Sequence, residues 1–323
     1  MKTFEKLNFI TYPTPMQEMV KLREVLKVKP RLYVKRDDLT EVGLGGNKNR
    51  KLDYIMAQAR GMGADAVITR GAIQSNHCRQ TAAYAAMLGM ECHLVLNGER
   101  VKKQGNHLVC DIFGAKIHYE PVEAKCEALC EAVAAELTAK GKKPYFIPVG
   151  ASTALGSLGY VDCVKELAEQ SKAANVRFDH LFCATGSAGT QAGLELGARL
   201  HMPGCKVHGI SVGRGSMEQS AKVAQCASEA ASLLGLDLSF SPGDISVYDG
   251  YFGAGYAVTT KEGVEAIRLL GRTQAILLDT VYSGKAMSGM LDILGKGNLD
   301  DAEGVIFIHT GGSPALYNFA ESF

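Results

Sequence analysis

The chain has 323 residues, 46% hydrophobic and 21% charged, which is typical of a globular protein with a substantial core and favours two domains. Its 35 basic and 34 acidic residues nearly cancel, and no dense run of lysine and arginine occurs, so we expect no nucleic-acid partner. No segment approaches the roughly 18 uninterrupted apolar residues of a membrane span, and the charged N-terminus is unlike a signal peptide. We therefore expect no membrane partner.

The nine cysteines indicate a reducing compartment. Their number is odd, no C-x-x-C pair occurs, and several lie inside apolar runs, as Cys183 does in LFCAT. Free thiols used as small core residues fit the cytoplasm, which is the predicted location. Paired Cys and His spacings are absent, so no metal site is predicted, and Cys126 and Cys130 are interpreted as packing residues.

Strand-like and helix-like segments alternate along the chain. Such alternation predicts an α/β fold with parallel sheets. The predicted strands, in chain order, are 31–35, 66–69, 92–96, 116–120, 144–150, 180–186, 206–212, 275–279 and 305–312. The predicted helices are 47–63, 75–89, 127–141, 158–173, 186–200, 216–235 and 261–271.

Two glycine-rich stretches, 43–47 and 150–159, supply the candidate domain boundaries. They predict a smaller domain over residues 47–158. The flanking stretches 1–46 and 159–323 then combine into a larger domain.

The first candidate site is the loop GLGGNKNRKL, which places Lys48 at the start of a predicted helix. Glycines let a backbone approach a ligand closely, and a lysine after them can reach a phosphate or form a Schiff base. Neither the P-loop pattern nor the dinucleotide pattern fits this loop. A solvated lysine is the simpler interpretation, but a cation here opposes the helix dipole, which favours a functional role.

The second candidate is GAIQSNHCRQTAA, where Ser75 and Asn76 open a helix after a strand. Backbone N–H groups at a helix N-terminus suit a carboxylate ligand, although a plain N-cap is the alternative.

The third candidate is ATGSAGTQAG at residues 184–193. A buried strand runs into a Gly/Ser/Thr turn and then a helix, which is the arrangement of a phosphate-binding loop. Ser187 and Thr190 could add hydroxyl donors, and a simple tight turn is the alternative.

Three further stretches place polar side chains where ligands bind in α/β sheets. They are YFGAGY with Tyr256, LDTVYSGKAMSG with Tyr282, and FIHTGG with Thr310. Each tyrosine alone is consistent with ordinary packing, and His309 is interpreted as a structural histidine.

Taken together and in this order, these stretches resemble the D-cysteine desulfhydrase and 1-aminocyclopropane-1-carboxylate deaminase group of fold-type-II pyridoxal-phosphate (PLP) enzymes. The resemblance runs from YPTPMQEM through VKRDDLTEVGLGGNKNRKL to FIHTGGSPAL. It implies two open, twisted, mostly parallel sheets flanked by helices, as in the tryptophan synthase β chain. It also implies PLP as cofactor, a small amino-acid substrate and a homodimer.

The resemblance further implies a role for each matching residue. Lys48 carries the cofactor covalently and takes the Cα proton, and Asn76 contacts the cofactor's phenolic oxygen. Ser75 with the backbone of Asn76 and His77 meets the substrate carboxylate, and Tyr256 and Tyr282 line the substrate pocket. Thr310 faces the pyridine nitrogen, which a hydroxyl cannot keep protonated as a carboxylate would. The phosphate is bound by Thr185, Gly186, Ser187, Ala188, Gly189 and Thr190.

The implied reaction is a β-elimination, with conversion of D-cysteine to pyruvate, ammonia and hydrogen sulfide as the first hypothesis. L-cysteate sulfo-lyases share most of these motifs and supply the second hypothesis. The cyclopropane deaminases carry Glu where this chain has Ser283, which argues against ring opening, and Cys78 replaces a usual aliphatic residue. A non-catalytic binder of PLP or another phosphate ligand is the alternative from a different class, and the presence of Lys48, Ser75 and Tyr282 argues against it.

Overall fold

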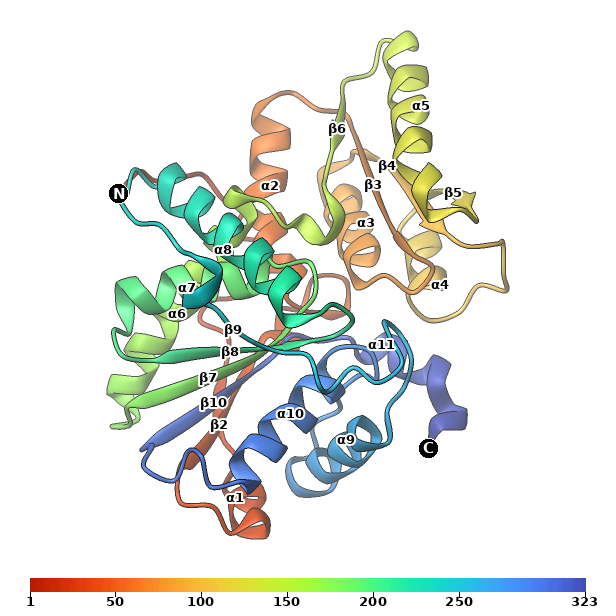
Figure 1. Ribbon diagram of the computed structural model, residues 1–323. Coiled ribbons are helices and arrows are strands. Elements are labelled where there is room, and N and C mark those ends of the chain that lie inside the picture. The colour runs from red at the N-terminus through yellow and green to blue at the C-terminus, as the bar shows by residue number, and fades with distance from the viewer.

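The computed structural model describes residues 1–323 and contains two separate β-sheets (Figure 1). The larger sheet has six strands in the order β1-β2-β10-β7-β8-β9. Every neighbouring pair is parallel except β1 with β2. The strands are β1 (Met16–Glu18), β2 (Arg31–Arg36), β7 (Phe178–Thr185), β8 (Lys206–Ser211), β9 (Ser246–Tyr248) and β10 (Gly304–His309).

The smaller sheet has four parallel strands in the order β5-β4-β3-β6. They are β3 (Ala66–Ala72), β4 (Glu91–Asn97), β5 (Lys116–Glu120) and β6 (Pro144–Phe146). Successive side chains of a strand point to opposite faces. Val67 accordingly packs with α3 (Asn76–Leu88), while Ile68 packs with α5 (Cys126–Ala139), so the two helices cover opposite faces.

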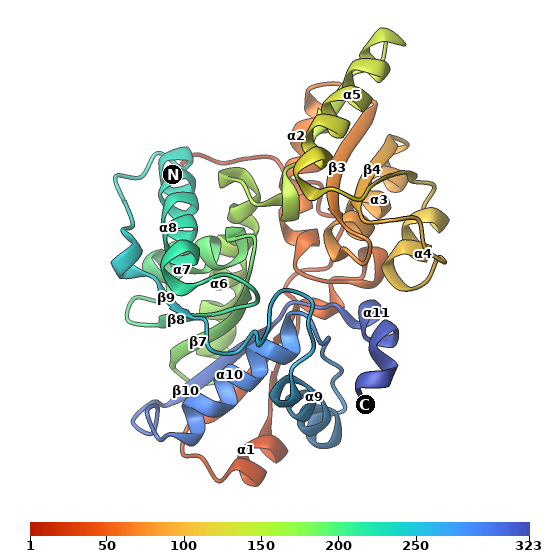
Figure 2. The same cartoon turned by 45° about the vertical axis from the view of Figure 1, so that its right-hand side comes forward.

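Helices also cover both faces of the larger sheet (Figures 1 and 2). One face carries α6 (Ala154–Ala173), α7 (Gly189–His201) and α8 (Ser216–Leu233), and the other carries α1 (Val20–Leu26), α9 (Lys261–Gln274) and α10 (Ser283–Gly295). The helix α2 (Lys48–Gly61) contacts both α6 and α3 and so bridges the two parts of the chain. The remaining helices are α4 (Gly105–Ile112) and α11 (Ser313–Leu316). The predicted α/β class, with two mostly parallel sheets flanked by helices, is confirmed.

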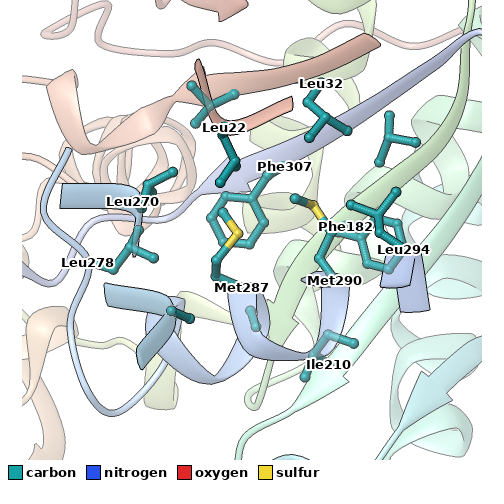
Figure 3. Close-up of a cluster of buried hydrophobic side chains, with 14 of the residues drawn as sticks. Leu22, Leu32, Phe182, Ile210, Leu270, Leu278, Met287, Met290, Leu294 and Phe307 are labelled. Carbon is teal, nitrogen blue, oxygen red and sulfur yellow. The ribbon is translucent and has the colours of Figure 1, made fainter. Parts of the chain in front are cut away.

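The helix α10 is fixed by a cluster of buried apolar side chains (Figure 3). Its Met287, Met290 and Leu294 pack in the same cluster as Phe182 of β7 and Phe307 of β10. Interiors are packed at crystal-like density, so a helix held in this way has little freedom to shift. The N-terminal end of α10 is therefore a rigid support for the residues around it.

The predicted strand at 275–279 is wrong. Ile276 and Leu278 are buried, yet residues 275–279 belong to no sheet. The neighbouring strand β10 already pairs with β2 and β7 on its two edges, and the Leu277 carbonyl is hydrogen-bonded by His309 Nε2 at 2.9 Å. An apolar run can therefore be buried by side-chain packing alone, without pairing to a neighbouring strand.

The glycines at 156 and 159 serve helix packing. Both lie inside α6, which begins four residues before its predicted start. A Cβ on Gly159 would lie 2.3 Å from the carbonyl oxygen of Arg50, so only glycine lets α6 approach α2 this closely. The domain boundaries at 47 and 158 stay a prediction.

None of the helices combines the length and the apolar character needed to cross a membrane. All the cysteines are free, and all except Cys205 are buried, as the interpretation of core thiols requires.

Candidate active site

A polar pocket lies where the carboxyl ends of β7 and β10 meet the N-terminal ends of α2, α3 and α7. The space between its lining atoms, including the part open to solvent, is about 420 Å³. Of the 13 residues that line it, 3 are hydrophobic. The lining residues are Asn47, Lys48, Asn76, Ala184, Thr185, Gly186, Ser187, Ala188, Thr190, Gln191, Tyr282, Thr310 and Gly311.

Lys48 begins α2 and lines this pocket. Its Nζ donates a hydrogen bond to Asn47 Oδ1 at 2.8 Å, and Asn47 Nδ2 in turn donates to Thr190 Oγ1 at 2.9 Å. Burial lowers the pKa of Lys48 to about 8; the positive charge of Arg79 lowers it further, and Asp279 opposes the change. A lysine with this pKa is partly neutral near pH 7 to 8, so it can act as a nucleophile or base.

The N-terminal end of α2 is held in place by a buried network of ion pairs. Arg50, two residues after Lys48, pairs with Asp37 at 2.7 Å and with Glu166 at 2.8 Å. Arg50 and Asp37 are both fully buried, and the Tyr160 hydroxyl also donates to Asp37. Breaking a buried pair of this kind leaves an uncompensated charge, which is strongly destabilising. The network therefore fixes the position of the helix that presents Lys48.

The loop between β7 and α7 offers free backbone donors. The N–H groups of Gly186, Ser187 and Ala188 donate to no acceptor within the protein. Ala188 has a φ of 74°, an unusual value for a residue with a side chain, at the N-cap of α7. Consecutive free N–H groups at a helix N-terminus form a binding site for an anion such as a phosphate.

Two residues outside the predicted set complete this loop. Lys51 is fully buried, and its Nζ donates to Ser152 Oγ at 3.1 Å and to the Gly150 carbonyl at 3.2 Å. Ser152 Oγ lies 2.8 Å from Ser187 Oγ and accepts from the Gly189 N–H at 3.2 Å. Burial, followed by the charge of Lys48, holds the pKa of Lys51 well below its ordinary value. A phosphate bound by the loop would supply the negative charge that this lysine lacks.

The turn between β3 and α3 is a capped helix start. Ser75 is the N-cap, and its Oγ accepts from the Cys78 N–H at 3.2 Å, as the plain N-cap interpretation requires. The Ser75 hydroxyl proton remains available for a ligand. The imidazole of His77 points away from the pocket, because its Nε2 is bonded to Thr69 Oγ1 at 2.8 Å within the smaller sheet. Only the backbone of His77 could meet a ligand.

Asn76 lines the pocket and is oriented by Asn106, which the sequence did not single out. Asn106 Nδ2 donates to Asn76 Oδ1 at 2.8 Å and to the Gln74 carbonyl at 2.8 Å. This bond occupies the amide oxygen of Asn76 and leaves its Nδ2 to act as a donor towards the pocket.

Tyr282 lines the pocket, and Tyr256, which lies in a different segment of the chain, contacts Tyr282. The two hydroxyl groups share a short hydrogen bond, and the rings meet edge to face with centroids 5.9 Å apart. Tyr256 is 48% exposed and is absent from the pocket lining itself. Burial raises the pKa of both tyrosines, so both keep their protons at neutral pH.

Thr310 follows β10 and lines the pocket. Its carbonyl accepts from the Asn47 N–H at 3.0 Å, while its hydroxyl donates to no protein group. The neighbouring His309 is structural, because its ring nitrogens contact the Leu277 carbonyl and the Gly311 N–H. The Ser283 hydroxyl is buried and donates to Asp279 Oδ1 at 2.6 Å, so it serves the start of α10.

The pocket fits the cofactor that the sequence resemblance implies. PLP requires an amine that can react with its aldehyde, a phosphate site and polar partners for its ring. Lys48 supplies a lysine with a lowered pKa, and the free N–H groups of residues 186–188 with Lys51 supply the phosphate site. Asn76 and Thr310 supply polar side chains for the ring. No group of His, Cys, Asp and Glu side chains is arranged to bind a metal ion.

Comparisons with known proteins agree with this geometry. The family model described as pyridoxal-phosphate dependent enzyme matches residues 7–311. The D-cysteine desulfhydrase of Serratia proteamaculans (strain 568) is 41% identical over 328 residues, which cover 98% of this chain and 96% of the relative. The D-cysteine desulfhydrase of Salmonella typhimurium is 41% identical over 322 residues, with the same coverage.

Solved structures lead to the same fold. A crystal structure described as an ACC deaminase homologue superposes with a TM-score of 0.90 and 38% sequence identity, covering 99% of this chain and 95% of that one. A pyridoxal 5'-phosphate-dependent aspartate racemase superposes with a TM-score of 0.69 at 17% identity, covering 97% of each chain, and shares the fold.

Proposed function

The chain belongs to the pyridoxal-phosphate dependent enzymes, and from that premise we propose that it eliminates hydrogen sulfide from D-cysteine. The observation that carries the proposal is Lys48, whose lowered pKa suits covalent chemistry, in one pocket with the free N–H groups of residues 186–188. The substrate is supported by relatives named D-cysteine desulfhydrase, which are 41% identical over nearly the whole chain.

We assign the cofactor contacts as follows. The N–H groups of residues 186–188 and the Lys51 ammonium bind the phosphate. The Asn76 amide donates to the phenolic oxygen of the ring, since its own oxygen is held by Asn106. The Thr310 hydroxyl faces the ring nitrogen and, unlike a carboxylate, supplies no negative charge that would favour protonation there. When bound, PLP supplies an electron-withdrawing ring that stabilises negative charge at the substrate Cα.

The protein groups then handle the protons. Lys48, with its pKa lowered to about 8, takes the proton from Cα. The Ser75 hydroxyl and the backbone N–H groups at the start of α3 hold the substrate carboxylate. Tyr282 keeps its proton at neutral pH, so it can donate to the departing sulfur while Tyr256 is bonded to its hydroxyl.

The reaction balances without an oxidant or reductant. The Cα–H and Cβ–S bonds break, the electron pair of the Cα–H bond forms the Cα–Cβ double bond, and the sulfur leaves with its bonding pair. The released aminoacrylate takes up water, so D-cysteine and water give pyruvate, ammonia and hydrogen sulfide.

A substrate panel tests this proposal. Pyruvate release is measured with D-cysteine, L-cysteine, L-cysteate, D-serine and 1-aminocyclopropane-1-carboxylate, the last through its own keto-acid product. We expect the largest kcat/KM with D-cysteine. A larger value with L-cysteate would reassign the protein as a sulfo-lyase, and turnover of the cyclopropane acid alone would reassign it as a deaminase.

Ser283 disfavours the deaminase assignment. Where the cyclopropane deaminases carry a glutamate, this chain has a small hydroxyl that is committed to Asp279, with Oγ to Oδ1 at 2.6 Å. No carboxylate from this position is therefore available to the pocket.

We further propose a homodimer located in the cytoplasm, with residues 47–158 as the smaller domain. The family resemblance supports the dimer, and the free, mostly buried cysteines suit a reducing compartment. Light scattering coupled to size-exclusion chromatography tests the dimer, since a single monomeric peak would contradict it.

A further inference from the structure

Lys285 is a buried cation that none of the roles assigned above uses. Its side chain is fully buried, and its Nζ donates to the carbonyl oxygens of Phe252 and Gly255, both at 2.9 Å. Burying an ammonium is costly unless its hydrogen bonds are satisfied, and here the partners are main-chain carbonyls of one segment. This places a strong, charge-assisted contact on that segment.

The contacted segment, residues 249–260, connects β9 to α9 and carries Tyr256. It contains no helix or strand, and its one internal backbone hydrogen bond joins the Val258 N–H to the Gly255 carbonyl at a long 3.4 Å. Gly253, Gly255 and Ala257 have φ values of 66°, 154° and 61°. A backbone with few bonds of its own and an alanine in the left-handed region needs support from outside to hold one shape.

Helix α10 supplies that support at two places. The Tyr251 hydroxyl donates to Asp292 at 2.6 Å, and Lys285 acts at the helix end that carries Tyr282. Lys285 lies three residues after Tyr282, so the two side chains leave neighbouring positions at the start of α10. The helix itself is held by Met287 and Met290 in the apolar cluster of Figure 3. One rigid element thus presents Tyr282 to the pocket and a cation to the segment of Tyr256.

The contact between the two tyrosines is a second link between the segment 249–260 and the start of α10. The Tyr256 hydroxyl is bonded to the Tyr282 hydroxyl, while the residue as a whole is 48% exposed, so the position of its hydroxyl depends on the path of its segment. A Cβ on Gly213 would lie 3.0 Å from the Tyr256 Cβ, so the glycine there leaves just enough room for this tyrosine.

We propose that Lys285 is a positioning residue: by binding the Phe252 and Gly255 carbonyls it holds the segment 249–260 against α10 and keeps the Tyr256 hydroxyl on that of Tyr282. Burial lowers the pKa of Lys285, and the negative charge of Asp279 opposes this change. The effect on turnover rests on the proposed function, whereas the effect on the segment does not.

The first test follows the segment itself. Hydrogen exchange of the PLP-loaded protein is compared between wild type, Lys285→Met, which keeps the apolar stem, and Lys285→Arg, which keeps the donors. We expect amides of residues 249–260 to exchange at least about tenfold faster in Lys285→Met. Amides of residues 286–295 should be unchanged, and Lys285→Arg should recover much of the protection. Unchanged exchange over 249–260 in Lys285→Met would overturn the proposal.

If Lys285→Met fails to fold, Lys285→Gln takes its place. A glutamine is shorter and uncharged, so it can satisfy at most part of the contact, and exchange over 249–260 should rise by a smaller factor. Protection equal to that of wild type in this variant would equally overturn the proposal.

The second test is a double-mutant cycle with Tyr256→Phe, using pyruvate release from D-cysteine. We expect Lys285→Met to lower kcat by about tenfold with unchanged cofactor content, and to have little further effect when Tyr256 is already Phe. Equal effects in both backgrounds would show that Lys285 does not act through Tyr256. If the wild type itself releases no pyruvate, the proposed function fails while the exchange result still decides the role of Lys285.

Discussion

Two junctions of the same design border the pocket, and they use their helix N-termini differently. In each, a parallel strand ends in a short turn that opens a helix: β7 leads into α7, and β3 leads into α3. At the first junction the N-cap is Ala188, and the N–H groups of residues 186–188 have no acceptor. At the second junction Ser75 caps the helix through its Oγ.

The two junctions also differ in the side chain at the N-cap. Alanine has no side-chain acceptor to cap the first turn of α7, and the N–H groups of residues 186–188 just before that turn are free for a ligand. The buried Lys51 is linked to this loop through Ser152. Serine satisfies one donor at α3, so that junction contributes side chains, such as Asn76, and a hydroxyl proton. The same strand-turn-helix arrangement therefore provides an anion site between β7 and α7 and directional polar contacts between β3 and α3.

The largest expected effect comes from placing a side chain in the junction between β7 and α7. A Cβ on Gly189 would lie 2.9 Å from Ser152 Oγ and 3.1 Å from Lys51 Nζ. We expect Gly189→Val to weaken PLP binding by about a hundredfold or more, because it displaces the phosphate-binding groups. The control is Gly271→Val in α9, where an added Cβ would meet nothing within 4 Å. If fluorescence titration shows that Gly189→Val binds PLP as tightly as the wild type does, the assignment of the loop is contradicted.

The next effect comes from removing the buried cation. Lys51→Met keeps the apolar stem and loses a charge-assisted hydrogen bond, for which we expect an approximately tenfold to hundredfold loss of PLP affinity. Lys261→Met, at a side chain that is 84% exposed, is the matched control and should bind PLP as the wild type does. Normal affinity in Lys51→Met would mean that this lysine serves the fold alone.

A smaller effect is expected at the capped junction. Ser75→Ala should lower the free energy of unfolding by ~1 kcal/mol, because the Cys78 N–H loses its acceptor, and should slow pyruvate release without changing PLP affinity. Urea denaturation and PLP titration measure the two quantities. Thr260→Ala, which removes the corresponding cap of α9, should cost similar stability. A large loss of PLP affinity in Ser75→Ala would show that the junction between β3 and α3 also binds the cofactor strongly, which contradicts the difference proposed between the two junctions.

The smallest effect concerns the charge that α3 presents to Lys48. Arg79 lowers the pKa of Lys48, so Arg79→Met should raise it from about 8 towards the ordinary value. The amine reacts only when neutral, so capture of PLP by the cofactor-free protein should increase as the pH rises through the pKa. The midpoint of that profile should move upwards in Arg79→Met and stay in place in Arg79→Lys. A profile unchanged in both variants would remove Arg79 from the account.

The fold was largely accessible from the sequence because buried parallel strands are continuous apolar runs with distinctive boundaries. The last strand is an example: the run VIFIHTGG predicted a strand over 305–312, and β10 covers 304–309, where every residue is buried. The same rule failed at residues 275–279, since an apolar run does not reveal whether a strand edge is free to pair with it. The helix α10 was missed because its first turns, SGKAMSG, are rich in small residues and lack an apolar stripe.

The site was accessible to a lesser degree. Lys48 could be singled out because it follows a glycine-rich turn, and Asn76 because it opens a helix directly after a strand. Lys51, Ser152 and Asn106 could not, since each acts on a group that is brought close only by the folded chain. For Lys51 a signal existed, namely that it is the third basic residue in the first turn of α2, after Lys48 and Arg50, where the helix dipole disfavours positive charge.

The central claim is that Lys48 carries the cofactor covalently while Lys51 binds only its phosphate. The most direct test is to reduce the PLP-loaded protein with borohydride, digest it and locate the modified lysine by mass spectrometry. We expect one modified residue, Lys48, and no modification in Lys48→Ala, which should still bind PLP without a covalent bond. Modification of Lys51, or of any other lysine, in the wild-type protein would contradict this claim.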